Sequence, residues 1–254
     1  MDEPRRVHEH GLGEPWVMLH GFTQTGACFD ELCDHMGVRG LAPDLPGHGA
    51  DPGTQITLDT ATSEVAGLLT SLGRPTPVLG YSQGGRVALH VALEHPELVS
   101  LLVIVSASPG LSEPEERAER ARVDEERALT LLSEGVDSFL DHWSALPMFA
   151  GLNERGQPWL LRDRERRQVH TAEGLAAALR GLGLGQQDDL LPRLGELQMP
   201  TLFVAGADDP AYVEHAFRMA SQAPRGIPVF LPRLSHAIVG QSPKVLAQVI
   251  RSGL

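Results

Sequence analysis

Short apolar runs alternate with amphipathic segments along most of the chain. The apolar runs have strand length and lie at residues 16–19, 40–44, 77–80, 99–105, 199–205 and 227–231, and a short edge strand is expected at residues 5–10. Apolar residues recur with helical spacing at residues 27–36, 57–72, 86–94, 211–223 and 243–251. The pattern predicts an α/β fold whose mostly parallel, twisted sheet is covered by helices on both faces.

This alternation breaks between residues 112 and 188, where no convincing strand is found. Helices are expected instead at residues 113–127, 128–134, 136–143, 157–168 and 172–182. We interpret the segment as a helical cap over the C-terminal edge of the sheet, where open α/β folds bind ligands. The predicted organisation is a core of residues 1–111 and 189–254 with an inserted cap subdomain of residues 112–188.

Composition and charge narrow the class of protein. A length of 254 residues with 42% hydrophobic residues suits one large α/β domain carrying an insertion. The net charge of −12 argues against a nucleic-acid surface, which needs clustered positive charge. Neither a membrane span nor the hydrophobic segment of a signal peptide is visible, so we expect a cytoplasmic protein. The oligomeric state is left open, and a monomer is compatible with the sequence.

Two residue types allow further expectations about chemistry. Cys28 and Cys33 are too few and too close for a disulfide framework, and we interpret them as packed thiols. Nothing in the sequence calls for a metal or an organic cofactor. Basic charge is carried by arginine except at Lys244. This bias is compatible with genomic base composition and equally with bidentate recognition of carboxylates.

A Gly-x-Ser-x-Gly motif separates the strand at 77–80 from the helix that follows it. In such a nucleophile elbow Ser82 takes a strained backbone conformation, and Gly80 and Gly84 let strand and helix approach closely. The N–H of Gln83 then lies at a helix N-terminus, where a developing negative charge is stabilised. The motif predicts a reactive serine with one oxyanion donor beside it.

Two later loops supply partners for this serine. A serine hydroxyl needs a histidine to accept its proton and a carboxylate to orient that histidine, and in this fold they follow in the order Ser, acid, His. Asp209 and His236 follow predicted strands in this order after Ser82. Asp208 is the competing acid, but the Gly-x-x-Asp spacing from Gly206 favours Asp209.

The strand at 16–19 ends in a second element of such a site. It runs into His20-Gly21-Phe22, where the N–H of Phe22 is expected to be the second oxyanion donor. His48, in a loop rich in proline and glycine, is interpreted as a structural histidine.

Several motifs of the chain occur together in one known family. They are His-Gly-Phe-Thr-Gln at residues 20–24, Asp-Leu-Pro-Gly-His-Gly at 44–49, the elbow at 80–86, Ser-Pro-Gly-Leu at 108–111 with Glu-Arg-Ala-Glu-Arg at 116–120, tryptophan 143 with Pro-Met-Phe at 147–149, and Gly-Leu-Ala at 174–176. The chain resembles α/β-hydrolases over its full length and, more narrowly, the 2-succinyl-6-hydroxy-2,4-cyclohexadiene-1-carboxylate synthases of menaquinone biosynthesis. The arginine directly after the elbow and the motif at 108–120 are the more specific part of this resemblance.

The resemblance implies a lyase rather than a hydrolase. Members of that family eliminate pyruvate from a succinylated cyclohexene dicarboxylate. Carried over to this chain, Ser82 assisted by His236 and Asp209 is the base that removes a ring proton. The N–H groups of Phe22 and Gln83 hold the oxyanion that forms.

The same resemblance implies a binding site for a small anionic, carboxylated substrate. Arg86 and Arg120 would bind its carboxylates, while Tyr81 and Trp143 would line the pocket. An acidic protein needs such a local arginine cluster to accept an anion.

Two departures from the family put the exact substrate in doubt. Where the family has a further substrate arginine, our alignment places Val169. Arg167 lies two residues earlier and is the candidate replacement, although a two-residue displacement on a helix points to another face. At the acid turn the sequence is Asp209-Pro210-Ala211-Tyr212, where the family tends to have a lysine and a phenylalanine after the acid.

Two other classes of function remain open at this point. The first is a serine hydrolase, a carboxylesterase or a carbon–carbon bond hydrolase, in which Ser82 is a covalent nucleophile. The second is a ligand receptor without catalysis, which would leave a complete triad and both oxyanion elements without a purpose.

Overall fold

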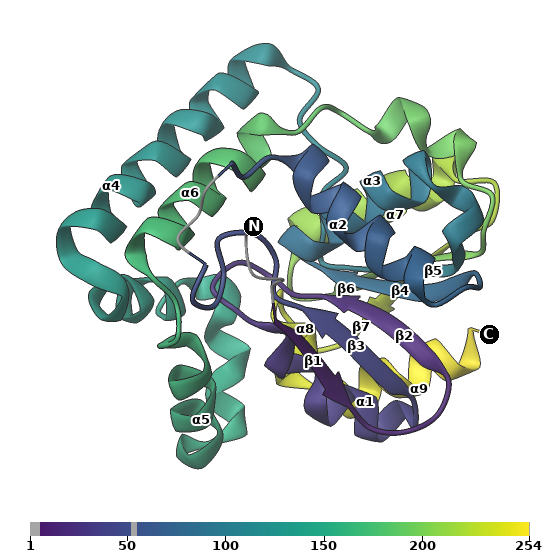
Figure 1. Cartoon of the computed structure of the whole chain (residues 1–254), viewed down its shortest axis with the longest axis horizontal. Helices are drawn as coiled ribbons and strands as arrows, with labels where there is room; N and C mark the ends of the chain where they lie inside the picture. Colours follow the sequence, from purple (N-terminus) through teal and green to yellow (C-terminus); the bar gives the residue numbers. More distant parts are fainter. Residues whose placement is uncertain (1–5, 52–54, 254) are drawn as a thin grey trace.

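The computed structural model describes residues 6–51 and 55–253, and a seven-stranded sheet runs through the molecule (Figure 1). The strand order is β1-β3-β2-β4-β5-β6-β7. Only β1 is antiparallel to its neighbour among the described strands. The strands are β1 Val7–His10, β2 Pro15–Leu19, β3 Arg39–Pro43, β4 Thr76–Tyr81, β5 Val99–Val105, β6 Thr201–Gly206 and β7 Gly226–Leu231. The predicted strands and the mostly parallel sheet are therefore confirmed, while the expectations for residues 1–5 lie outside the described residues.

Helices cover both faces of this sheet. On one face lie α2 Leu58–Ser71, α3 Gln83–Glu94 and α7 Pro210–Gln222, and on the other lie α1 Asp30–Met36, α8 Ile238–Gln241 and α9 Pro243–Ser252 (Figure 1). Each layer buries its own apolar cluster against alternate residues of the central strands, such as Val78 toward α3 and Leu79 toward α1 and α9. Short 3₁₀ helices occupy Gly26–Phe29, Pro96–Leu98, Pro147–Arg155, Leu184–Gln186 and Leu191–Glu196.

The start of α2 illustrates how sequence fixes an element boundary. The hydroxyl of Thr57 accepts the N–H of Thr60, and the hydroxyl of Thr60 accepts the N–H of Thr57. This reciprocal capping satisfies backbone donors that the helix leaves unpaired. The helix therefore begins at the first position of its apolar pattern, Leu58.

A helical segment, residues 114–182, is inserted between β5 and β6. It consists of α4 Pro114–Ser144, α5 Gln157–Arg167 and α6 Ala172–Leu182, which lie beside the sheet layers in Figure 1. Leu131 of α4 and Leu175 of α6 belong to a separate apolar cluster that also contacts Phe22. The structure joins the helices that we predicted at 113–127 and 128–134, because no helix-breaking residue separates them. It interrupts α4 at Gly135, whose φ is 82°.

Two further sequence expectations concern membranes and thiols. Within the described ranges no helix is both long enough and apolar enough to span a membrane. Cys28 and Cys33 are not joined in a disulfide. Cys33 is buried beside Met18, as a packed thiol would be.

Candidate active site

Ser82 stands in a tight turn between β4 and α3. Its φ of 52° and ψ of −111° lie outside the regions that L-residues prefer, and its N–H donates to the carbonyl of Val105 at 2.9 Å. A side chain at Gly80 would collide with the carbonyl of Gly84, and one at Gly84 with the carbonyl of Leu19. The glycines therefore allow the close approach that holds the serine in this conformation.

A continuous hydrogen-bonded chain leads from this serine to a carboxylate. His236 Nε2 lies 3.1 Å from Ser82 Oγ, and His236 Nδ1 lies 2.9 Å from Asp209 Oδ2. The imidazole is only 2% exposed, whereas Asp209 is half-buried at the start of α7. The competing acid, Asp208, is exposed. The structure thus brings together the three residues that the sequence put forward, with the acid that the glycine spacing favoured.

The two expected oxyanion donors lie beside this chain. Phe22 follows β2, Gln83 is the first residue of α3, and both line the same cavity as Ser82. Within the described part of the chain neither backbone N–H donates a hydrogen bond to protein. These N–H groups are therefore available to a negatively charged oxygen.

The turn after Phe22 is held by residues from the helical segment. Thr23 has a φ of 64°, which is rare for a β-branched residue. Arg167 Nη1 donates to Thr23 Oγ1 at 2.6 Å, and His170 Nε2 lies 2.9 Å from the Thr23 carbonyl oxygen. Asp163 in turn accepts from Arg167 Nε at 2.7 Å. Two residues of one short segment thus fix the strained turn that carries a proposed oxyanion donor.

Arg167 and Val169 lie in different surroundings in the structure. Arg167 is 7% exposed and lines the cavity, whereas Val169 is 53% exposed. Our reservation about helix faces does not apply, because α5 ends at Arg167 and Val169 lies beyond it. Of the two positions, only Arg167 is placed to meet a ligand beside Ser82.

Three arginines and one carboxylate form another part of the cavity wall. Arg86 is buried at the start of α3, and its Nη1 donates to Gln187 at 3.3 Å. Burial lowers the pKa of Arg86 to about 10, so it remains charged at neutral pH. Asp124, buried in α4, accepts from Arg120 at 3.0 Å and from Arg127 at 3.1 Å. The group carries more positive than negative charge.

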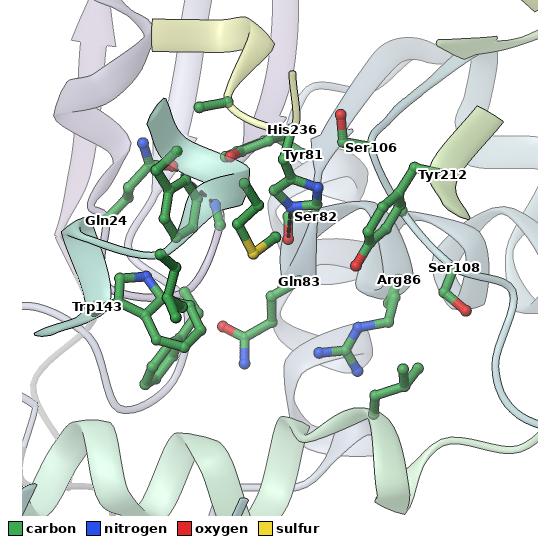
Figure 2. A pocket seen from close by; sticks show the side chains of 18 of the residues that line it. Gln24, Tyr81, Ser82, Gln83, Arg86, Ser106, Ser108, Trp143, Tyr212 and His236 are labelled. Atoms are coloured by element: carbon green, nitrogen blue, oxygen red, sulfur yellow. Dashed lines mark hydrogen bonds between the residues drawn. The ribbon is translucent and has the colours of Figure 1, made fainter. Parts of the chain in front are cut away.

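Aromatic rings complete the cavity, which has a volume of about 290 Å³ (Figure 2). Tyr81 and Tyr212 flank His236, with ring centroids 5.7 and 4.4 Å from the imidazole. Trp143 packs against Phe22 at 5.3 Å and under the Arg127 guanidinium, which lies 5.5 Å from its ring. The site therefore combines an apolar, aromatic surface with charged and hydrogen-bonding side chains.

Other histidines near the site have structural partners. His20 lies 2.9 Å from the carbonyl of Gly21 through Nδ1, and its Nε2 accepts the N–H of Leu45 at 2.9 Å. Burial lowers the pKa of His20 to about 3 and that of His170 to about 4. His48 is buried against both rings, and its Nδ1 lies 3.1 Å from the carbonyl oxygen of Pro46. Among the described residues, no group of three potential metal ligands converges on a point.

Comparison with known proteins assigns the chain to a family. A model of the alpha/beta hydrolase family matches residues 16–249. The chain belongs to the alpha/beta hydrolase family. This confirms the predicted fold class and explains why the triad residues follow strands in the order Ser, acid, His.

Several named proteins are similar to this α/β-hydrolase over most of its length. A 2-succinyl-6-hydroxy-2,4-cyclohexadiene-1-carboxylate synthase of Escherichia coli O1:K1 is 31% identical, over 96% of this chain and 97% of that protein. The structure of MenH from S. aureus superposes with a TM-score of 0.91 at 29% identity, covering 99% of this chain and 97% of that one. A thermophilic esterase from Thermogutta terrifontis, solved with malate bound, gives a TM-score of 0.82 at 25% identity, covering 97% and 91%. The resemblance seen in the sequence is thereby confirmed.

Sequence reasoning missed several residues of this α/β-hydrolase's cavity. Asp124 and Arg127 lie in the helix expected at residues 113–127, where no motif gave them a role, and Gln187 had no motif around it. One available signal was the three-residue and four-residue spacing of acids and arginines in α4, which predicts ion pairs on one helix face. Nothing local identified the Arg86–Gln187 contact, which joins residues 101 positions apart.

Proposed function

We propose that the protein is a lyase that eliminates pyruvate from a succinylated cyclohexene dicarboxylate and yields 2-succinyl-6-hydroxy-2,4-cyclohexadiene-1-carboxylate. One observation carries the proposal: the chain Ser82–His236–Asp209 opens into the same cavity as an arginine group with excess positive charge. The E. coli relative that bears this synthase's name and the fit to MenH support it.

In the proposed mechanism the triad acts as a base. His236 takes the hydroxyl proton of Ser82, and the serine oxygen removes a proton from a ring carbon of the substrate. Asp209 holds Nδ1 of the imidazole and stabilises its positive charge. The electron pair of the broken C–H bond forms a ring double bond while the bond to the pyruvyl group breaks. Ser82 is then a neutral hydroxyl again because it carries the ring proton, and His236 gives its own proton to the departing group, which leaves with the electrons of the broken bond.

Negative charge develops on a carbonyl oxygen next to the carbon that loses its proton. The N–H groups of Phe22 and Gln83 are the proposed donors to that oxygen. Fixed donors in a buried site stabilise such charge without reorganising, which is why removal of one donor costs roughly 10²-fold to 10³-fold in rate in related sites.

The substrate carboxylates are assigned to the arginines. Arg86 and Arg120 are the first candidates, and Arg167 lies at the side of the cavity near Tyr81. Asp124 compensates part of this charge, so the unliganded site is not a bare cluster of cations. Trp143 and Tyr81 provide apolar surface for the ring.

A serine hydrolase is the second candidate. The 3.1 Å contact between Ser82 Oγ and His236 Nε2 suits a covalent nucleophile equally well, and the T. terrifontis esterase is a structural relative. The two mechanisms differ in one intermediate, because only the hydrolase forms an acyl-serine that water must cleave.

The test is pyruvate release from the succinylated cyclohexene precursor, prepared enzymatically in situ. The lyase proposal expects wild-type release well above the spontaneous rate and a drop of about 10³-fold in kcat for Ser82→Ala. Folded wild-type protein that releases no pyruvate but forms a trapped acyl-serine with aryl esters would instead establish the hydrolase.

A further inference from the structure

Tyr212 occupies a position next to the reacting groups that the mechanism above does not use. It lies in the first turn of α7, and its N–H donates to the carbonyl of Asp209 at 3.1 Å. Its ring meets the His236 imidazole edge-on with a centroid distance of 4.4 Å. Asp209 thus holds the backbone of Tyr212, and His236 packs against its ring.

The hydroxyl of Tyr212 reaches the cavity rather than the protein interior. Figure 2 shows it pointing toward the guanidinium of Arg86, on the side of Ser82 away from Trp143. Within residues 6–51 and 55–253 this hydroxyl has no hydrogen-bond partner. Tyr212 is only partly buried, and it lines the cavity, so its hydroxyl can donate to a ligand bound there.

The protonation states of the two groups suit an anion. Burial raises the pKa of Tyr212, so the phenol keeps its proton at neutral pH and can donate it in a hydrogen bond. The positive charge of Arg86 opposes this rise without cancelling it. Arg86 donates one N–H to Gln187, and its guanidinium carries further N–H groups that can donate to a ligand. A carboxylate has two oxygens and accepts from both kinds of donor.

We propose that the Tyr212 hydroxyl and the Arg86 guanidinium together bind one carboxylate of the substrate, the hydroxyl donating to one oxygen and the guanidinium to the other. This inference rests on the proposed function and names the contacts of one of its carboxylates. Tyr212 acts here as a specificity residue. Its hydrogen bond strengthens the binding of substrates whose carboxylate lies at one defined distance from Ser82.

The second tyrosine of the cavity provides a matched comparison. Tyr81 lies on the other side of His236, and the arginine with the strongest electrostatic effect on its phenol is Arg167 rather than Arg86. Removal of the Tyr81 hydroxyl deletes the same atom from the same cavity. Only Tyr212 is expected to be energetically coupled to Arg86.

The experiment measures ligand binding without turnover. The probe is 4-oxo-4-phenylbutanoate, which places a carboxylate on a succinyl chain attached to a ring, and its control is the corresponding amide. Calorimetry on wild type, Tyr212→Phe, Arg86→Ala and the double variant gives a double-mutant cycle. We expect Tyr212→Phe to weaken binding of the acid about tenfold and that of the amide less than twofold. On the Arg86→Ala background the effect of Tyr212→Phe falls below twofold, whereas Tyr81→Phe shows no coupling to Arg86→Ala.

Steady-state kinetics of pyruvate release separate binding from other roles of Tyr212. We expect Tyr212→Phe to raise KM about tenfold and to leave kcat within twofold. A fall in kcat at unchanged KM would overturn the proposal, because it would place the phenol's effect on His236. Equal affinity of Tyr212→Phe and wild type for the acid would overturn it as well. If pyruvate is not released but the cycle shows the expected coupling, the carboxylate site stands and the lyase function fails.

Discussion

The two walls of the cavity are built by different means. On the sheet wall, the backbone positions Ser82, Asp209 and His236 at the ends of β4, β6 and β7, and buried side chains leave them little freedom. On the helical wall, Arg120 and Arg127 are placed by side-chain pairing with Asp124. In the proposed mechanism the fold thus separates reactivity, which depends on a rigid frame, from recognition, which depends on exchangeable side chains.

The sheet wall is expected to respond most strongly to a change of a single atom. Asp209→Asn keeps the shape of the acid but favours the wrong tautomer of His236, so we expect kcat for pyruvate release to fall about 10⁴-fold with KM little changed. Asp208→Asn is the matched control on the adjacent, exposed residue and is expected to retain kcat within twofold. Similar losses in both variants would mean that the acid has been assigned to the wrong residue.

The loops around the cavity that His20 and His170 hold in place are expected to make the folded protein less stable in acid. His20 and His170 each accept a backbone N–H through one ring nitrogen, from Leu45 and Gly49, so both must be neutral in the folded protein. Their pKa values of about 3 and about 4 lie below the 6.5 of an unperturbed histidine. The unfolded chain therefore binds more protons below pH 6.5, and the free energy of unfolding falls as pH drops from 6.5 toward 4. Each histidine contributes about 1.4 kcal/mol per pH unit well inside this window.

Denaturant unfolding at several pH values between 7 and 5 measures this decline. Because His170 supplies one share of it, the His170→Gln variant is expected to be less stable at pH 7 and to lose less free energy on acidification than wild type. Parallel pH curves for the two proteins would show that His170 is not held neutral by the fold.

The helical wall is expected to show a smaller effect, confined to binding. Asp124→Asn removes the charge that orients two arginines, so we expect KM to rise about tenfold while kcat changes less than threefold. Glu119→Gln, in an exposed ion pair with Arg122 on the same helix, is the control and is expected to leave both parameters within twofold. A large loss of kcat in Asp124→Asn would contradict the division of labour between the walls.

Local sequence signals predicted most of the sheet wall. The elbow around Ser82 is a contiguous motif because a strained strand-to-helix turn needs glycine at fixed positions, and the order of acid and histidine follows from the topology. The positions of the buried strands were readable because strands covered on both faces are continuously apolar. Both features depend on residues that are neighbours in the chain.

The helical wall could be predicted only in outline. That helices replace strands after β5 was visible in the spacing of apolar residues, but the burial of Asp124 depends on how α4 meets α6, which no local pattern encodes. The 3₁₀ helix Pro147–Arg155 and the short helix Ile238–Gln241 were missed because such short helices have too little periodicity to detect. The placement of Arg167 depended on where α5 ends.

The interruption of α4 at Gly135 has a geometric consequence for the aromatic wall of the cavity. Arg127 and Trp143 are 16 positions apart, about 24 Å along a straight helix, yet the guanidinium lies 5.5 Å from the indole ring. Gly135 thus bends the long helix and brings Trp143 back toward Arg127 at the wall of the cavity. A substitution at this bend is expected to move the aromatic end of α4 while the elbow around Ser82 stays in place, so the shape of the aromatic wall can change independently of the serine.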